Sequence, residues 1–178
     1  MRIISGTLKG RRLQPPKNLP VRPTTDRAKE SLFNILIHQY DFDEATVLDL
    51  FAGTGSISYE FASRGVKQVV ALDNNVQCVN FITKTAENLA LPITVVRAPV
   101  LRFMERISTS YNFIFADPPY AFNIEEYREL VETIFSKNAL QIGGLLVVEH
   151  AEQMDLSALT HFREARNYGG CIFSFFEV

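Results

Sequence analysis

The stretch Val47-Leu48-Asp49-Leu50-Phe51-Ala52-Gly53-Thr54-Gly55 decides the fold. Its hydrophobic first half is typical of a strand that is covered on both faces, as the strands of parallel sheets are. Gly53 and Gly55 allow the backbone to turn sharply and to approach a ligand without an intervening Cβ. A helix is predicted to begin near Ser56, so its free N–H groups would face the turn. Such a turn at the carboxyl end of a strand is typical of a nucleotide-type cofactor site.

A second stretch, Phe113-Ile114-Phe115-Ala116-Asp117-Pro118-Pro119-Tyr120, has the same organisation. A hydrophobic strand again ends in a polar cluster. We therefore expect the two clusters to lie side by side at one edge of a sheet. The rest of the chain is expected to support this pair or to bring a substrate to it.

The length and composition fit a single folded domain. The chain has 178 residues, of which 47% are hydrophobic, so global disorder is not expected. No apolar run approaches the ~20 residues that span a bilayer, and the N-terminus lacks the apolar region of a signal peptide. Cys78 and Cys171 lie in apolar segments, which favours reduced thiols in a cytoplasmic protein. Their spacing from the three histidines matches no zinc motif, so no metal is predicted.

Charge is distributed unevenly along the chain. Residues 1–30 hold eight basic and two acidic side chains, whereas the remainder carries a net charge of −8. Residues 1–24 are therefore interpreted as a basic arm and linker, and residues 25–178 as the main domain. A basic arm on an acidic body favours contact with phosphates, although a solvated terminus would have the same composition. Arg11, Arg12 and Lys17 are the candidate phosphate contacts.

The spacing of hydrophobic residues predicts the elements. Residues 2–14 are predicted to form a short hairpin, four prolines hold residues 15–23 extended, and a helix begins at Thr25 or Asp26. Strands are then predicted at 46–51, 68–72, 93–96, 112–116 and 145–149, and helices at 56–64, 75–89, 100–107 and 124–137. Single helices between strands indicate right-handed βαβ units. Residues 162–167 and 171–178 should close the sheet as an antiparallel hairpin. The fold class is α/β, a Rossmann-like three-layer sandwich.

The glycine turn indicates which cofactor binds. Asp73 ends the second strand, where a carboxylate can accept both hydroxyls of a ribose, or else cap the next helix, as Asn74 or Asn75 also could. The third glycine of the dinucleotide fingerprint is replaced by Ser58, so a pyrophosphate is disfavoured. S-adenosylmethionine, which has no phosphate at this point, fits better. Asp49 could lie near the amino group of this cofactor.

Asp117, Pro118 and Tyr120 are the candidate catalytic residues. The Asp117 carboxylate and the Pro118 carbonyl can both accept hydrogen bonds from one planar –NH₂ group, and Tyr120 offers a flat face for stacking a base. This arrangement suits the positioning of an exocyclic amine opposite a methyl donor. Glu149 and His150 are interpreted as a surface strand end with a minor chance of substrate contact. Phe173, Phe175 and Phe176 are expected in the core.

These residues together resemble the RsmD family of ribosomal RNA guanine-N2 methyltransferases, which are class I S-adenosylmethionine-dependent enzymes. The resemblance rests on Met1–Gly6, Gly10-Arg11, Arg22–Asn34, Asp49–Gly55, Asp73, Asp117–Tyr120 and Val148–His150. It implies methylation of a guanine amine in 16S rRNA on an assembling small subunit. It also implies a mostly parallel seven-stranded sheet with an N-terminal hairpin extension, and a monomer.

The resemblance extends the predicted site. By family analogy, Arg22, Thr24 and Arg27 lie near the entrance for cofactor and RNA, and the chain departs from the family at Arg97-Ala98-Pro99-Val100, where a polar residue usually contacts the adenine ring. The predicted cofactor-binding set is Asp49, Phe51, Ala52, Gly53, Thr54, Gly55, Asp73, Asn74, Ala98, Asp117, Arg22 and Thr24, and the RNA-binding set is Arg11, Arg12, Lys17, Arg27 and Tyr120.

Two other functions remain open from the sequence. Adenine N6 or a protein glutamine also presents an –NH₂ group to an Asp-Pro-Pro-Tyr cluster. A non-catalytic RNA-binding assembly protein with a decayed cofactor pocket is the alternative from a different class, and the missing polar residue near Pro99 gives it some support.

Overall fold

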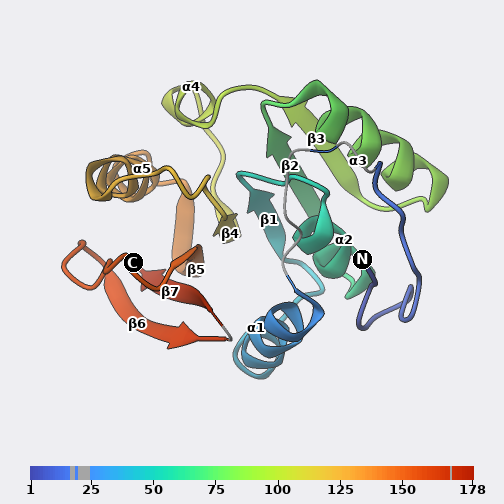
Figure 1. The fold of residues 1–178 in the computed structure, drawn as a ribbon, viewed down its shortest axis with the longest axis horizontal. Helices are drawn as coiled ribbons and strands as arrows, with labels where there is room; N and C mark the ends of the chain where they lie inside the picture. The colour runs from blue at the N-terminus through green and yellow to red at the C-terminus, as the bar shows by residue number, and fades with distance from the viewer. Residues whose placement is uncertain (17–18, 20–24, 169) are drawn as a thin grey trace.

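The computed structural model describes residues 1–16, 19, 25–168 and 170–178. Helices and strands alternate along most of the chain, as predicted (Figure 1). In chain order the elements are α1 (Asp26–Gln39), β1 (Thr46–Asp49), α2 (Ser56–Ser63), β2 (Gln68–Asp73), α3 (Val76–Asn88), β3 (Ile93–Arg97), α4 (Val100–Glu105), β4 (Tyr111–Ala116), α5 (Ile124–Ser136), β5 (Leu140–Ala151), β6 (Phe162–Asn167) and β7 (Cys171–Glu177).

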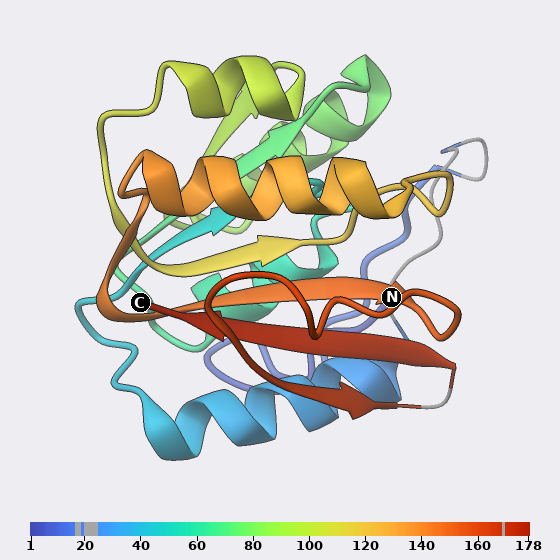
Figure 2. The same cartoon turned by 90° about the vertical axis from the view of Figure 1, so that its left-hand side faces the viewer.

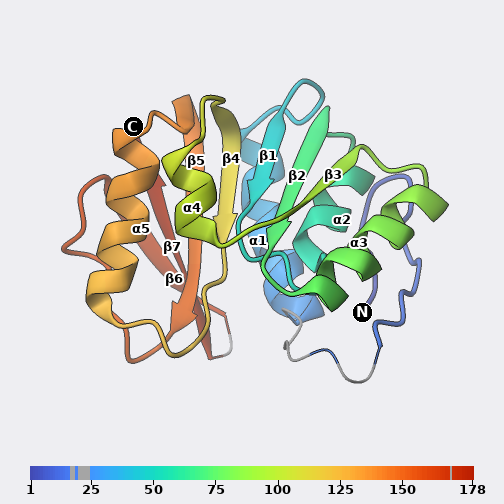
Figure 3. The same ribbon diagram turned by 90° about the horizontal axis from the view of Figure 1, so that it is seen from above.

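The described strands form one seven-stranded sheet in the order β3-β2-β1-β4-β5-β7-β6. Strands β1 to β5 pair in parallel, and β7 is antiparallel to both β5 and β6. The sequence of strands can be followed across the sheet in Figure 3. The predicted class I Rossmann-like architecture with its closing hairpin is confirmed. The strand order reverses between β1 and β4, and open α/β sheets bind ligands at such a switch point.

Strand residues alternate between two hydrophobic layers, which is why single strands carry unbroken apolar runs. Figure 2 shows α5 and α1 on opposite faces of the sheet. The layer under α1 and α2 contains Leu32, Phe33, Phe61, Val47, Phe113, Phe115, Val147, Phe173 and Phe175. The other layer packs α4 and α5 against the sheet through Met104, Leu130, Ile134, Leu48, Ile114, Leu146, Val148 and Phe176. The predicted core position of the three C-terminal phenylalanines is therefore confirmed.

Strand β5 is longer than predicted. Strand β5 begins at Leu140, five residues before the predicted start, because Gly143 adopts φ +76° and the strand continues through it. The pairing with β4 shifts register between Tyr111 and Phe113 to absorb this irregularity. On α3, Cys78, Ile82, Thr85 and Ala86 are buried against the sheet, and Val79 and Leu89 are half-buried.

The N-terminal segment packs on α2 without forming regular strands. A single antiparallel bridge joins Arg2 to Arg12, and Ile3 is buried. The backbone N–H of Thr7 donates to the Ser63 carbonyl at 2.7 Å. A Cβ on Gly6 would lie 1.8 Å from that carbonyl oxygen, and Gly6 has φ +83°, so only glycine fits this contact. In the described part of the chain, no helix is long and apolar enough to cross a membrane.

Candidate active site

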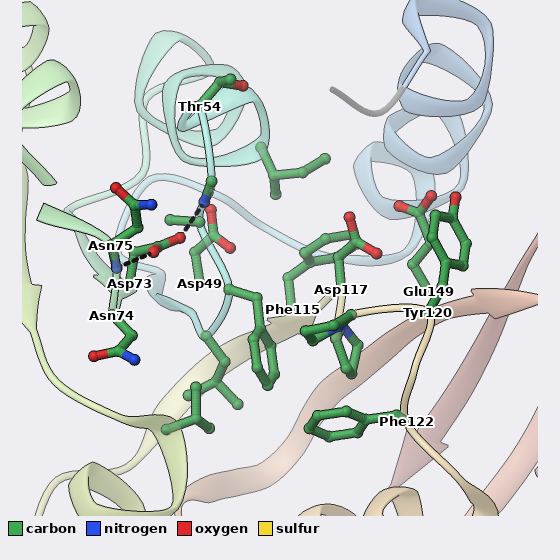
Figure 4. Close-up of a pocket in the computed structure, with 18 of the residues that line it drawn as sticks. Asp49, Thr54, Asp73, Asn74, Asn75, Phe115, Asp117, Tyr120, Phe122 and Glu149 are labelled. Carbon is green, nitrogen blue, oxygen red and sulfur yellow. Dashed lines mark hydrogen bonds between the residues drawn. The ribbon is translucent and has the colours of Figure 1, made fainter. Parts of the chain in front are cut away.

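The two predicted clusters line one cavity of about 1220 Å³ at the carboxyl ends of β1, β2 and β4 (Figure 4). The glycine turn, Asp73 and the Asp-Pro-Pro-Tyr segment all contribute to its wall. They meet because β4 pairs with β1, and β1 pairs with β2. The expectation that the two clusters share one edge of the sheet is thus met by the geometry.

Asp73 holds the glycine turn in shape. One carboxylate oxygen accepts the Gly53 N–H and the other accepts the Asn75 N–H, each at 2.7 Å. Asn75, and not Asp73, caps α3 by accepting the N–H groups of Gln77 and Cys78. Each carboxylate oxygen has a second lone pair, so Asp73 can still accept hydroxyls from a ligand. Asn74 lines the cavity beside it.

Gly55 has φ +80° at the start of α2, where a Cβ would lie 2.8 Å from the Tyr59 ring. Both the backbone conformation and this neighbour therefore require glycine. Phe51, Ala52 and Thr54 complete this wall of the cavity. The Thr54 hydroxyl also lies 3.5 Å from the Met1 sulfur, which brings the N-terminal segment to the turn.

Asp49 is the most deeply buried acid of the site, with 1% of its surface exposed. Its carboxylate accepts the Ser58 hydroxyl at 2.6 Å. Burial raises the pKa of Asp49 to about 7, and the nearby charge of Asp73 acts in the same direction, whereas the Ser58 hydrogen bond opposes it. The side chain therefore exchanges its proton near neutral pH.

Asp117 directly follows β4 and faces the cavity, with Pro118 and Pro119 beside it. Burial raises the pKa of Asp117 well above its usual range, and the charges of Glu149 and Asp49 add to the shift. Tyr120 stands at the wall with 70% of its surface exposed, so its ring is accessible to a base. The Phe122 N–H donates to the Pro119 carbonyl and closes the turn, and its ring packs edge-on against Phe51.

The interpretation of Glu149 and His150 as a surface strand end is wrong. Glu149 is 7% exposed and lines the cavity, and His150 is 3% exposed with Nε2 2.7 Å from the Ser174 hydroxyl. Strand β7 pairs with β5 through these positions and covers them. The β6–β7 connection also brings Tyr168 and Cys171 to the cavity. No local pattern in the sequence signals these contributions, because they depend on antiparallel pairing of distant segments.

Ala98 packs against the core beneath α4, and its N–H donates to the Asp73 carbonyl. Its neighbours Arg97, Pro99 and Val100 line the cavity. Pro99 and Val100 therefore give this wall an apolar surface, which lies between the charged side chains of Arg97 and Asp73 in the lining of the cavity. Such a wall can hold a flat ring by contact with Pro99 and Val100.

The predicted RNA contacts lie on two surfaces. Arg11 and Arg12 are exposed beside a shallow groove between the N-terminal segment and α3, and Arg27 is exposed on α1. Lys17, Arg22 and Thr24 lie outside the described residues. Lys29, which follows Arg27 on α1, is instead 1% exposed, and its ammonium group lies 3.4 Å from the Glu60 carboxylate.

The donor set fits S-adenosylmethionine. A carboxylate at the end of β2 suits a ribose diol, and the glycine turn admits close approach of the cofactor. Several carboxylates around the cavity suit a positively charged ligand. Among the described residues, no group of three or more Asp, Glu, His or Cys side chains is placed to hold a metal ion.

Three comparisons with known proteins agree with this geometry. The family model described as conserved hypothetical protein 95 matches residues 1–177. The chain is 34% identical to the ribosomal RNA small subunit methyltransferase D of Haemophilus influenzae over 84% of this chain and 78% of the relative. It is 33% identical to the Escherichia coli K12 protein of the same name, over 84% and 71%. The solved structure of Thermus thermophilus protein TTHA0928 superposes with a TM-score of 0.87 at 27% identity, covering 100% of this chain and 99% of that one.

Proposed function

The chain belongs to the RsmD family of S-adenosylmethionine-dependent methyltransferases, and from that membership we propose that it methylates the N2 amine of a guanine in 16S rRNA. The names of the relatives specify small-subunit rRNA and do not specify the atom. The observation that carries the proposal is the shared cavity of the glycine turn and the Asp117–Tyr120 segment.

In this proposal Asp73 accepts the ribose hydroxyls of the cofactor, and the turn from Phe51 to Thr54 supports its methionine portion, while Gly55 shapes the turn without lining the cavity. When bound, S-adenosylmethionine supplies an electrophilic methyl group. Four carboxyl groups line the cavity, those of Asp49, Asp73, Asp117 and Glu149, and the negative charge of their ionised forms favours this cationic cofactor.

In this proposal the Asp117–Tyr120 segment holds the target amine of the guanine base. The Asp117 carboxylate and the Pro118 carbonyl would each accept a hydrogen bond from one N–H group of the amine, so that the nitrogen lone pair would be free to face the methyl group. Tyr120 would stack on the base. Transfer of the methyl group would break its bond to the sulfonium sulfur, release the cofactor as a neutral thioether and leave a positive charge on the nitrogen, whose N–H bonds would become more acidic. The Asp117 carboxylate stabilises that charge and takes the proton that the nitrogen releases. Asp117 must be ionised for this role, so its raised pKa predicts that activity increases with pH.

The substrate is proposed to be an assembling small ribosomal subunit, engaged by a monomer of this protein. The exposed Arg11 and Arg12 would bind phosphates while the target base enters the cavity. A flipped base is needed because the amine of a paired guanine is not accessible to Asp117.

Methylation of small-subunit particles from a strain that lacks the enzyme tests the proposal. With tritiated cofactor, the label should appear in N2-methylguanosine after digestion to nucleosides. The Asp117→Ala variant should lose at least about 1000-fold in kcat and retain cofactor binding by calorimetry, because it loses an interaction made with the amine.

Asp43→Ala serves as the matched control, since Asp43 is exposed and lies in the loop before β1. It should methylate at the wild-type rate. Label in N6-methyladenosine would show that the protein methylates adenine and not guanine. Near-normal turnover by Asp117→Ala would show that Asp117 has no role in catalysis.

A further inference from the structure

Glu149 lies beside Asp117 on the same face of the sheet. Phe115 pairs with Val147 and Ala116 pairs with Val148, so the next residues of the two strands, Asp117 and Glu149, are neighbours. Neighbouring strands are about 4.8 Å apart, and alternate residues share a face. Both carboxylates line the cavity, and Figure 4 shows them with Tyr120 on the same wall.

Two adjacent carboxylates repel each other when both are ionised, and this repulsion contributes to the raised pKa of Asp117. A ligand with two adjacent hydrogen-bond donors would relieve it. The Watson–Crick edge of guanine has this pattern, since N1–H and the N2 amine are both donors. Adenine presents its amine next to N1, which is an acceptor and would face a carboxylate.

We propose that Glu149 is the residue that selects guanine, because it accepts the N1–H bond while Asp117 and the Pro118 carbonyl hold the N2 amine. This assignment rests on the proposed methylation of guanine N2 and adds the contact that reads the base. Burial of Glu149 to 7% exposure strengthens the discrimination, because a mismatched acceptor would remain desolvated beside it. Tyr120 holds the base plane and does not discriminate, since every base has a stacking face.

The proposal is tested with a base that keeps the amine and loses the N1–H. 2-Aminopurine has the 2-amino group of guanine, but its N1 is an acceptor. Small-subunit RNA is prepared with guanine or 2-aminopurine at the methylated position, and single-turnover rates are compared. The wild-type protein should prefer guanine by at least about tenfold, as expected for a lost hydrogen bond to a charged group.

Glu149→Gln should reduce this preference by at least about tenfold, because a glutamine amide can accept N1–H of guanine or donate to N1 of 2-aminopurine. Glu132→Gln, an exposed position on α5, is the matched control and should keep the wild-type preference. Cofactor affinity of Glu149→Gln is measured by calorimetry to confirm that the cavity is intact.

Equal rates of the wild-type protein on guanine and 2-aminopurine would overturn the role of Glu149 and leave guanine methylation in place. An unchanged preference in Glu149→Gln would do the same. Methylation of adenine by the wild-type protein would instead overturn both this inference and the proposed function. The wild-type comparison needs no variant, so a Glu149→Gln protein that fails to fold does not prevent the test.

Discussion

Asp49 illustrates what burial does to a single carboxylate. Its pKa is about 7 in the folded protein, compared with a reference value of 3.8. Between these values the folded state retains a proton that the unfolded state has released. The unfolding free energy therefore falls as pH rises through this window, by about 4 kcal/mol at full effect. Below the window both states are protonated, and above it both are ionised.

Replacing Asp49 with asparagine should remove this pH dependence. In the wild-type protein the Ser58 hydroxyl donates a hydrogen bond of 2.6 Å to Asp49. The amide oxygen of the Asp49→Asn side chain can accept the same hydrogen bond. Urea unfolding of the cofactor-free protein from about pH 5 to about pH 8 measures the effect. The stability advantage of Asp49→Asn over the wild type should grow up to about pH 7 and then remain constant. Parallel curves would show that Asp49 titrates normally.

At the scale of elements, a buried ion pair joins α1, α2 and the N-terminal segment. The Lys29 ammonium donates to the Arg2 carbonyl at 2.7 Å and to the Ser56 hydroxyl at 3.3 Å. Glu60, which is fully buried, accepts the backbone N–H groups of Ile4 and Ser5 and pairs with Arg64 at 2.9 Å. Desolvation lowers the pKa of Lys29, and Glu60 opposes that shift. The network fixes the N-terminal segment beside the start of α2.

Lys29→Met should reduce the unfolding free energy by about 3 kcal/mol, because it leaves the buried Glu60 carboxylate partly uncompensated. Amide hydrogen exchange at Ile4 and Ser5 should also accelerate. Lys67→Met is the control, since Lys67 forms an exposed pair with Glu44 at 2.7 Å, and its stability should equal that of the wild type. Wild-type stability of Lys29→Met would mean that Arg64 and the two amides are sufficient partners for Glu60.

The parts of the fold and the site that local sequence patterns determine were predictable. Apolar runs located the strands, and parallel strand order placed Gly53, Asp73 and Asp117 at one edge. The burial of Glu149 was not predictable, because a charged residue at a strand end is usually exposed, and the strand that covers it, β7, begins more than twenty residues later. The burial of Lys29 was not predictable for the same reason, since its partner Glu60 lies on another helix. Long-range contacts of charged residues leave no periodic signal.

At the scale of the whole molecule, opposite charges occupy neighbouring regions. The exposed Arg11 and Arg12 belong to the segment whose first residue contacts Thr54 of the glycine turn, whereas the cavity is lined by carboxylates. Phosphates are attracted to the segment and repelled by the cavity. A nucleic acid can thus be held by its backbone while only an uncharged base approaches Asp117.

Arg11→Ala combined with Arg12→Ala should weaken RNA binding and flatten its dependence on salt. Each lost phosphate contact reduces the slope of log affinity against log salt by about 0.7 for single-stranded RNA. Filter binding across a salt series measures the slope. Arg106→Ala combined with Lys137→Ala removes two exposed charges after α4 and α5 and should leave the slope unchanged. An equal slope in both double variants would exclude the N-terminal segment from RNA binding.

Helix α2 has only eight residues, about 12 Å of length, and connects the glycine turn at one end with the N-terminal segment at the other. Gly55 precedes its first turn, and Ser63 in its last turn contacts Gly6 without room for a single methyl group. Because α2 is short and closely packed at both ends, we expect a shift of one end to move the other end as well. Binding of RNA beside one end of α2 and of S-adenosylmethionine beside the other should therefore be thermodynamically coupled, so that each ligand raises the affinity of the protein for the other.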